Sequence, residues 1–360
     1  MLAGALAVAL SGCASEGINR GGTVLSDTLT VYSLLPDPRT PTAADIVDGE
    51  KLALAQAGGR AGGRTVNFVS LEEGADGKPG EVADATRDVI SDTQVIAVIG
   101  GLESAGTRTS APLFNEAGLL QVGLGAGYPG LTRRERPDEP ARYQPSAHTT
   151  FARVVGDDLQ QARPIVSAAK GARGAWTLAI ESEGDDDSQA LARAVERVAR
   201  GAGGRVVDDP RRADAFVYAG SDPVNAAGVA DGWAREAPDA RIVLPDAVVR
   251  AGVAERLSPA ARRRAWLVSS APASASPGWR SFAAEFRRRL GREPGPYAAV
   301  GYEAMRSVLV ALDRAGSRAN QRQRVIDAYL SAPERPSLLG PLKVDARGDR
   351  VAPRFTVERP

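Results

Sequence analysis

The chain has 360 residues, which is too long for one ordinary domain and long enough to bury two cores. Its 45 Lys and Arg residues nearly balance its 44 Asp and Glu residues, so the composition carries no basic signal for nucleic-acid binding. A single cysteine excludes a disulfide framework and a cysteine-based metal site.

The N-terminal segment predicts export. The stretch MLAGALAVALSGC is apolar over roughly ten residues, which is too short to span a bilayer. Its last four residues, 10–13, resemble the bacterial lipobox, which implies that residues 1–12 are removed and that Cys13 is acylated. Residues 13–28 are small and polar and would tether a folded body to the membrane. The alternative is an ordinary signal segment with a chance cysteine. No Lys or Arg precedes the apolar run, which leaves open whether translation begins upstream.

From Leu29 onward, apolar runs alternate with amphipathic stretches typical of helices. Strands are expected at 29–35, 64–72, 95–101 and 119–124, and helices at 43–57, 81–92 and 105–118. Nearly continuous apolar strands that alternate with helices indicate a parallel sheet covered on both faces.

A segment rich in proline and charge, 132–145, interrupts this pattern, which then begins again. The second series is expected to hold a helical region at 149–170 that Pro164 kinks, strands at 175–182, 204–209, 213–220 and 241–246, and helices at 188–200 and 224–235. It predicts a second doubly wound lobe. Later helices are expected at 278–291, 297–316 and 322–331, followed by two strands around a turn at 345–349.

The sequence VGLGAGYPGLT at 122–132 places Gly125, Gly127 and Gly130 at the spacing of a dinucleotide-binding loop. Such a loop must open a helix, but Pro129 lies inside the motif and further prolines follow it. A glycine-rich loop beyond a strand end is therefore the favoured interpretation.

Several segments occur in the order found in one known family. The segments DGEKLALAQAGGRAGGRTVNFVS, VIAVIGGLESAGTRTSAPLFNEAGLLQVGLGAGYPGLT, ADAFVYAG, YAAVGYEAM and GPLKVDARGD resemble type I periplasmic binding proteins, in particular the Leu/Ile/Val-type substrate-binding proteins of ABC transporters. The resemblance implies an α/β fold with two doubly wound parallel-sheet lobes joined by hinge crossings. It assigns 29–142 and 272–336 to the first lobe, and 143–271 and 337–360 to the second.

The resemblance also implies ligand contacts from both lobes. Ser104 corresponds to a serine that binds a ligand carboxylate. Gly125 and Gly127 lie in a second ligand loop, where Gly127 replaces a threonine and its hydroxyl is lost. Tyr218 corresponds to a pocket tyrosine, and Asp246 to the carboxylate that pairs with a ligand ammonium.

Local chemistry adds to the expectations for Ser104 and Asp246, and for Ser104 it does so without the family. Ser104 is expected to cap the helix that follows it, and the free amides of that helix form an anion site. The alternative is that Ser104 only caps. A buried Asp without a cationic partner is costly, so Asp246, at a strand end in the cleft that the resemblance implies, is expected to meet a positive ligand. The alternative is a turn-forming Asp beside Pro245.

Acidic residues mark a departure from the family pattern. Asp185, Asp186 and Asp187 stand where relatives often have an aromatic residue and a glycine, and Glu103 precedes the expected carboxylate-binding serine. A solvated acidic loop is the favoured interpretation, since consecutive Asp residues lack the alternate spacing of a calcium loop. The alternative is an acid-lined mouth, with Glu103 and Asp187 favouring a more polar or cationic ligand than leucine. Thr42 is a further pocket candidate, expected in the loop after the first strand.

The resemblance implies an extracytoplasmic lipoprotein that captures an amino acid or related compound between its lobes. It would deliver this ligand to an ABC transporter permease, with no nucleic-acid partner. An enzyme, a cofactor and a metal site are not expected: the only histidine is His148, and no nucleophile, P-loop or metal-ligand motif is present. The alternative is a ligand-sensing or degenerate binding lipoprotein that is not coupled to transport.

Overall fold

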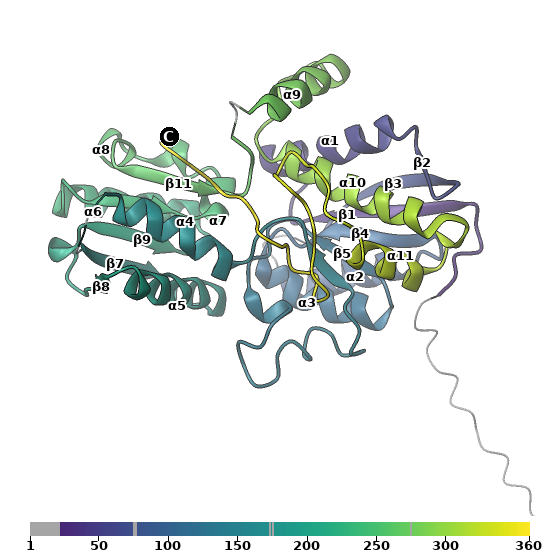
Figure 1. Ribbon diagram of the computed structural model, residues 1–360, viewed down its shortest axis with the longest axis horizontal. Coiled ribbons are helices and arrows are strands. Elements are labelled where there is room, and N and C mark those ends of the chain that lie inside the picture. The colour runs from purple at the N-terminus through teal and green to yellow at the C-terminus, as the bar shows by residue number, and fades with distance from the viewer. Residues whose placement is uncertain (1–21, 75–77, 173, 175, 274–275) are drawn as a thin grey trace, which may run out of the picture.

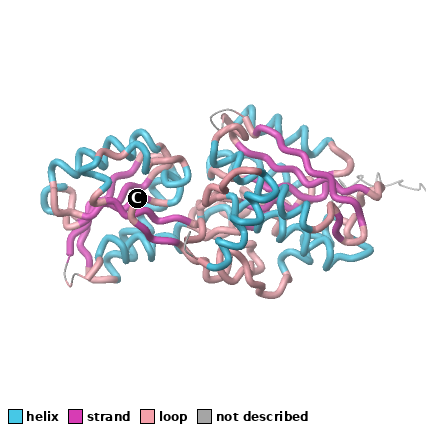
Figure 2. The backbone as a smooth tube through the Cα atoms, turned by 90° about the horizontal axis from the view of Figure 1, so that it is seen from above, coloured by secondary structure: helices cyan, strands magenta, loops and turns pink. Residues whose placement is uncertain are grey.

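The computed structural model describes residues 22–74, 78–172, 174, 176–273 and 276–360. In these ranges two lobes lie side by side, and each contains one sheet flanked by helices (Figure 1; Figure 2). Of the helices described, none combines the length and the apolarity needed to cross a bilayer. Cys13 and most of the expected tether lie outside the described residues.

The first sheet has the strand order β2-β3-β1-β4-β5-β6. Its pairs are parallel except for the antiparallel pair of β2 and β3. Its strands are β1 (Thr28–Leu35), β2 (Arg60–Ala61), β3 (Arg64–Glu72), β4 (Val95–Gly100), β5 (Leu120–Gly123) and β6 (Phe151–Arg153). The helices of this lobe are α1 (Pro41–Gln56), α2 (Pro79–Ser91), α3 (Ser104–Glu116), α9 (Pro277–Leu290), α10 (Ala298–Ala315) and α11 (Arg322–Leu330), with short 3-10 turns at η2 (Pro129–Leu131) and η5 (Gly316–Arg318).

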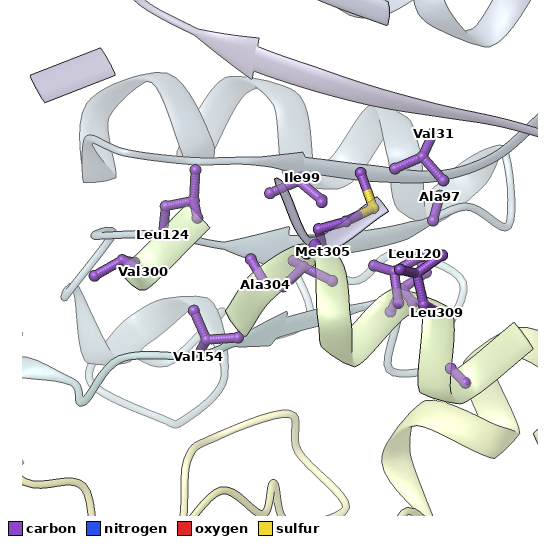
Figure 3. Close-up of a cluster of buried hydrophobic side chains, with 14 of the residues drawn as sticks. Val31, Ala97, Ile99, Leu120, Leu124, Val154, Val300, Ala304, Met305 and Leu309 are labelled. Carbon is purple, nitrogen blue, oxygen red and sulfur yellow. The ribbon is translucent and has the colours of Figure 1, made fainter. Parts of the chain in front are cut away.

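Helices cover both faces of the first sheet. Strand β4 consists of the apolar run VIAVIG, and all of its residues are buried because neighbours lie on both sides. Helices α1, α10 and α11 pack on one face, and α2 and α3 pack on the other. Figure 3 shows the first interface, where Ile99 and Leu120 of the sheet face Met305 and Leu309 of α10.

Helices α1 and α10 approach closely through two glycines. A Cβ atom added to Gly301 would lie 2.1 Å from the carbonyl oxygen of Ile46, and one added to Gly49 would lie 2.0 Å from that of Ala298. Any side chain at either position would push the helices apart. The late helix α10 is therefore fitted to the early helix α1.

The second sheet has the strand order β12-β11-β10-β9-β7-β8 and is parallel except for the antiparallel pair of β11 and β12. Its strands are β7 (Trp176–Ser182), β8 (Gly204–Val206), β9 (Ala215–Ala219), β10 (Arg241–Leu244), β11 (Ala265–Ser269) and β12 (Thr356–Glu358). The helices of this lobe are α4 (Asp158–Lys170), α5 (Asp186–Gly201), α6 (Pro223–Glu236), α7 (Asp246–Arg250) and α8 (Pro259–Arg262), with 3-10 turns at η3 (Pro210–Arg212) and η4 (Ala254–Arg256).

Strand β9 shows how the second sheet serves two cores. Ala215 and Val217 point to the face covered by α4 and α5, whereas Phe216 and Tyr218 point to the face covered by α6, α7 and α8. This alternation follows from the two-residue period of a strand. Every residue of β9 is buried, as expected for a central parallel strand.

Two expectations about element positions need correction. Residues 151–153 form strand β6 in the first sheet, so the first sheet extends past the expected boundary at 142. The expected helical region at 149–170 therefore begins only at Asp158, and Pro164 lies inside α4. In the tail, an isolated bridge joins Val344 to Arg350 around the turn, and only β12 is a strand.

A buried polar cluster joins the tail to the first lobe. Asp349 is 1% exposed, and its carboxylate accepts hydrogen bonds from Thr132 Oγ1 and Arg133 Nε, each at 2.7 Å. Arg153, which is fully buried, brings its Nε to 3.4 Å from Asp349. Asp157 Oδ2 lies 3.4 Å from Arg133 Nε, so two carboxylates balance the two guanidinium groups where the chain leaves β6 for the second lobe.

Candidate functional site

A cavity of about 370 Å³ lies between the lobes and is lined by residues of both. The residues that line it include six of the eight expected from the sequence: Glu103, Ser104, Gly125, Gly127, Asp187 and Asp246. Thr42 and Tyr218 do not line it.

Ser104 lies at the start of α3 but does not cap the helix. The N-cap is Glu103, which makes no capping hydrogen bond with its side chain, and Ser104 is the first helical residue. The Ser104 hydroxyl instead accepts a hydrogen bond from the backbone N–H of Tyr128 at 3.1 Å. This hydrogen bond holds the glycine-rich loop beside the helix. The loop leads into the short η2 turn, and no longer helix follows it there, unlike in a dinucleotide-binding loop.

Asp246 has protein partners for both carboxylate oxygens, contrary to the expectation of an unpaired carboxylate. Oδ1 accepts hydrogen bonds from the Ser270 N–H at 2.6 Å, the Ser270 hydroxyl at 2.9 Å and the Tyr297 hydroxyl at 2.8 Å. Oδ2 accepts one from Arg250 Nη1 at 2.9 Å. The resemblance implies that Asp246 pairs with a ligand ammonium group. In this structure Arg250 of the protein pairs with Asp246 instead.

Arg250 reaches across the cleft from α7. Its Nη2 donates to the Leu102 carbonyl oxygen and to Glu103 Oε1, each at 3.0 Å. Burial alone would lower the pKa of this guanidinium, but the charges of Glu103 and Asp246 outweigh burial and raise the pKa. Arg250 therefore stays charged and holds the two lobes together.

The two loop glycines leave room for charged side chains of the second lobe. A Cβ atom added to Gly125 would lie 2.8 Å from Arg250 Nη1, and one added to Gly127 would lie 2.2 Å from Asp158 Oδ1. The Asp158 carboxylate therefore occupies the space that the side chain of the family's threonine would need at position 127. Because glycine lacks Cβ, the loop can approach both groups closely.

Glu73 and Asp158 both line the cavity, and among the described residues neither side chain has a hydrogen-bond or ion-pair partner. Burial, with the charges of Asp187 and Asp157, raises the pKa of Asp158 to about 7. Glu73 follows strand β3 and is 1% exposed, and its Oε1 is buried without a partner. Burial, reinforced by the charge of Glu103, raises the pKa of Glu73 to about 8.

Tyr218 lies behind the cavity wall and acts through Glu183. Its hydroxyl donates to Glu183 Oε1, and it accepts a hydrogen bond from Asn225 Nδ2 at 2.9 Å. Glu183 lines the cavity and also accepts from the backbone N–H groups of Ser221 and Asp222, at 3.0 and 2.8 Å. Tyr218 therefore positions a lining residue and is itself fully buried.

The three consecutive Asp residues begin helix α5 and do not form a loop, although Asp185 is exposed to solvent. Asp185 is the N-cap of α5 and accepts from the N–H groups of Asp187 and Ser188. Asp186 pairs with Arg136, and Asp187 pairs with Arg108 at 2.7 Å, so both carboxylates contact first-lobe residues across the cleft. Burial raises the pKa of Asp187 to about 6, although Arg108 opposes the shift. Asp185 and Asp187 line the cavity together with Glu103, so its wall is acidic at this point.

Thr42 lies in the first turn of α1 and not in a loop, since Thr40 is the N-cap. Its hydroxyl donates to the backbone carbonyl oxygen of Arg250 at 2.8 Å. It thus contacts the second lobe and supports the residue that crosses the cleft. His148 is exposed, and no group of three or more His, Cys, Asp or Glu residues suited to a metal ion occurs in the described part of the chain.

The lining residues that were not expected from the sequence include five charged ones: Glu73, Arg108, Asp158, Glu183 and Arg250. One signal was available, because Arg250 follows Asp246 by four residues, the spacing at which helical side chains pair. Glu73 and Asp158 carry no local motif. Each follows a strand end at the cleft, where ligands of open α/β sheets bind.

Comparison with known proteins identifies a matching family model and several solved structures with a similar fold. A family model described as "Periplasmic binding protein" matches residues 38–225. The leucine binding protein LivK from Thermotoga maritima is similar with a TM-score of 0.74 at 18% identity, over 92% of this chain and 99% of that chain. An ABC transporter substrate-binding protein from Desulfitobacterium hafniense gives 0.73 at 18% identity, over 92% and 100%.

A third similar structure is a solute binding protein of an ABC transporter from Rhodopseudomonas palustris BisB5 in complex with 3,4-dihydroxy benzoic acid. Its TM-score is 0.72 at 19% identity, over 93% of each chain. No curated protein matches this chain by sequence. At these identities the structural similarity shows the fold alone, and it confirms the expected two-lobed α/β architecture.

Proposed function

Because the chain belongs to the periplasmic binding protein family and has its two-lobed type I fold, we propose that it captures a small solute between its lobes and delivers it to an ABC transporter permease. The observation that carries this proposal is the cavity of about 370 Å³ to which both lobes contribute polar and charged side chains. Family members are extracytoplasmic and bind solutes without converting them, and we infer no enzymatic step here.

Capture would work by closure. The ligand contacts come from loops of both lobes, so they are complete only when the lobes are together. A ligand that contacts both lobes binds the closed form more tightly and shifts the equilibrium toward it. Arg250 and Arg108 supply part of the closing energy, since each pairs with a carboxylate of the opposite lobe. The closed form would present a surface made of both lobes to the permease.

Attachment to the membrane is part of the proposal. Acylation of Cys13 would hold the body near the permease, because one lipid chain gives reversible binding and two give stable anchoring. Metabolic labelling with an alkyne fatty acid tests this: incorporation is expected in the natural chain and lost in Cys13→Ser. Labelling of both proteins, or of neither, contradicts the anchor.

The ligand class is proposed as an amino acid or related compound. Similar structures are described as complexes with leucine, isoleucine and 3,4-dihydroxy benzoic acid, which shows that this fold accommodates several small solutes. The pairing of Asp246 with Arg250 favours a compound other than a free α-amino acid.

Thermal unfolding of the full chain against a panel of amino acids, amines and aromatic acids tests capture. A ligand present at a hundred times its dissociation constant stabilises the protein by about 2.7 kcal/mol, which raises the midpoint by several degrees. Uptake of the ligand found in this way should fall in cells that lack the gene and return on complementation. Binding without any effect on uptake would support the sensing alternative and contradict transport.

A further inference from the structure

The cavity between the lobes holds many more carboxylates than cations. Among its lining residues are two arginines, Arg108 and Arg250. The lining carboxylates number seven: Glu73, Glu103, Asp158, Glu183, Asp185, Asp187 and Asp246. The surplus of negative charge has to be balanced by protein donors, by protons or by a ligand.

Protein donors balance five of the seven. Asp246 and Glu103 pair with Arg250, and Asp187 pairs with Arg108. Glu183 accepts from backbone N–H groups, and Asp185 caps α5. Both lining arginines take part in these pairs: Arg250 donates to Asp246, Glu103 and the Leu102 carbonyl oxygen, and Arg108 donates to Asp187 through Nη1.

Glu73 and Asp158 are the two that remain. Glu73 belongs to the first lobe and Asp158 to the second, so a ligand that contacts both would bridge the cleft. Within the described ranges neither side chain has a hydrogen-bond or ion-pair partner, and Oε1 of Glu73 is fully buried without one. Glu73 is buried, so its missing donor costs free energy that a bound cation would recover, whereas Asp158 is half-buried and open to the cavity.

The start of α3 does not offer an open anion site. A Cβ atom added to Gly106, in the first turn of that helix, would lie 2.9 Å from Glu73 Oε1 and 3.4 Å from Oε2. The Glu73 carboxyl group therefore faces the helix terminus at which a ligand carboxylate would bind. A ligand that brought its own carboxylate there would meet an acidic side chain.

The walls also restrict the kind of cation. Among the described residues that line the cavity, none is aromatic. Quaternary ammonium ions are recognised by aromatic faces, whereas primary ammonium and guanidinium groups donate hydrogen bonds to carboxylates. The lining fits a cation with N–H groups.

We propose that the cavity binds a small organic cation without a carboxylate, an alkyl diamine or a guanidino-alkylamine, and that Glu73 and Asp158 are its recognition residues, one from each lobe. This assignment rests on the proposed function, since it names the solute class that closure would capture. Arg250 then serves as the fixed counter-ion of Asp246 and not as a ligand contact.

The proposal carries a pH signature. Burial is the largest cause of the raised pKa of each group. The charge of Glu103 also raises the pKa of Glu73, and the charges of Asp187, Asp157 and Asp246 raise that of Asp158, opposed by Arg153. A bound cation favours the ionised carboxylates, so binding releases protons at neutral pH. With pKa values of about 8 for Glu73 and about 7 for Asp158, affinity should rise from pH 6 to pH 8.5 and then level off while the amine remains charged.

Titration calorimetry of the full chain with 1,4-diaminobutane and agmatine tests the proposal, with tetramethylammonium, L-leucine and benzoate as comparison probes. Binding of a diamine or agmatine is expected, with proton release seen as a dependence on buffer ionisation enthalpy. Glu73→Gln and Asp158→Asn should each weaken binding by at least about tenfold, because each removes one charged acceptor. Glu50→Gln is the matched control: Glu50 is also buried with unpartnered oxygens, but it does not line the cavity, so affinity should not change.

Each outcome has a distinct meaning. Binding of L-leucine or benzoate but not of the amines overturns the assigned ligand class and leaves solute capture intact. Equal binding of tetramethylammonium and the diamine overturns the role of N–H donors. Amine binding that is insensitive to both Glu73→Gln and Asp158→Asn overturns the two recognition residues. Absence of binding to every probe overturns the ligand class and counts against capture as well.

Discussion

Arg250 of the second lobe and Glu103 of the first lobe form an ion pair across the cleft, with 3.0 Å between Nη2 and Oε1. The same guanidinium pairs with Asp246 on its own helix at 2.9 Å. One side chain therefore stabilises a local turn and the approach of the lobes together. Because its side chain is only 3% exposed, solvent screens these contacts weakly.

Replacement of Arg250 by Met should open the cleft and destabilise the protein. The change removes the donors to Leu102 and Glu103 and leaves Asp246 buried without its cation. Loss of one partner of a buried pair costs about 3–5 kcal/mol. Small-angle scattering should show a larger radius of gyration without ligand, and urea unfolding should show the lost stability. Arg256→Met, at an exposed position of the same lobe, controls for loss of an arginine; an unchanged radius in Arg250→Met would refute the crossing role.

Replacement of Glu50 by Gln should change how stability depends on pH. Glu50 is fully buried in α1, and burial raises its pKa to about 8. The folded protein thus keeps a proton that the unfolded chain releases above its ordinary pKa of about 4.3. The free energy of unfolding falls by up to about 1.4 kcal/mol per pH unit between these two pKa values, and this contribution is constant above pH 8.

The Glu50→Gln protein should lose this contribution, so its stability should fall less steeply from pH 5 to pH 8 than that of the natural protein. Urea unfolding at several pH values measures the two slopes. Asp84→Asn, which removes an exposed carboxylate on α2, controls for the loss of one negative charge. Parallel curves for the Glu50→Gln and natural proteins would show that Glu50 is not protonated in the folded state.

Glycines in two helices should respond in opposite directions to a change to Ala. In α10, Gly301→Ala places Cβ 2.1 Å from the Ile46 carbonyl oxygen of α1, so the helices must separate, at a cost of about 1–3 kcal/mol or more. In α6, Gly228 has no atom within 4 Å of an added Cβ, so Gly228→Ala should stabilise by about 0.5–1 kcal/mol through helix propensity. Thermal unfolding of both variants checks this, and a stable Gly301→Ala protein would contradict the close packing.

Removal of the Asp349 carboxylate should weaken the junction between the tail and β6. Asp349→Ala leaves the fully buried Arg153 without its ion-pair partner, and the expected loss is about 3 kcal/mol. Asp349→Asn keeps an acceptor for Thr132 and should lose less. In urea unfolding, the free energy of unfolding should be highest for the natural protein, lower for Asp349→Asn and lowest for Asp349→Ala. Equal stability of all three proteins would mean that the buried charges are balanced in another way.

Local sequence patterns predicted most elements of the fold. The run VIAVIG became β4, and the late helices expected at 297–316 and 322–331 became α10 and α11, because apolar periodicity is a local property. Strand β6 was missed because it has three residues and precedes a helix that shares its composition. Its place is determined by pairing with β5, which no local pattern contains.

The site was predictable in its loops and not in its pairings. Ser104 and the glycines could be placed because they follow strand ends. The partner of Asp187 is Arg108, which lies 79 positions earlier in the chain, and only the approach of the two lobes joins them. The isolation of Glu73 also depends on long-range structure, since it arises where β3 ends beside α3.

The packing of α10 against α1 has a consequence for the order in which the chain becomes structured. Synthesis produces α1 early and α10 late, after every strand of the second lobe except β12. Until α10 emerges, Ile99 and Leu120 lack the helix residues Met305 and Leu309 that pack against them (Figure 3). A nascent chain therefore cannot complete its first lobe before nearly all of it has left the ribosome, and long-range closure of this kind is slow. In the export proposed for this chain, the delay would keep the first lobe unfolded until late in synthesis.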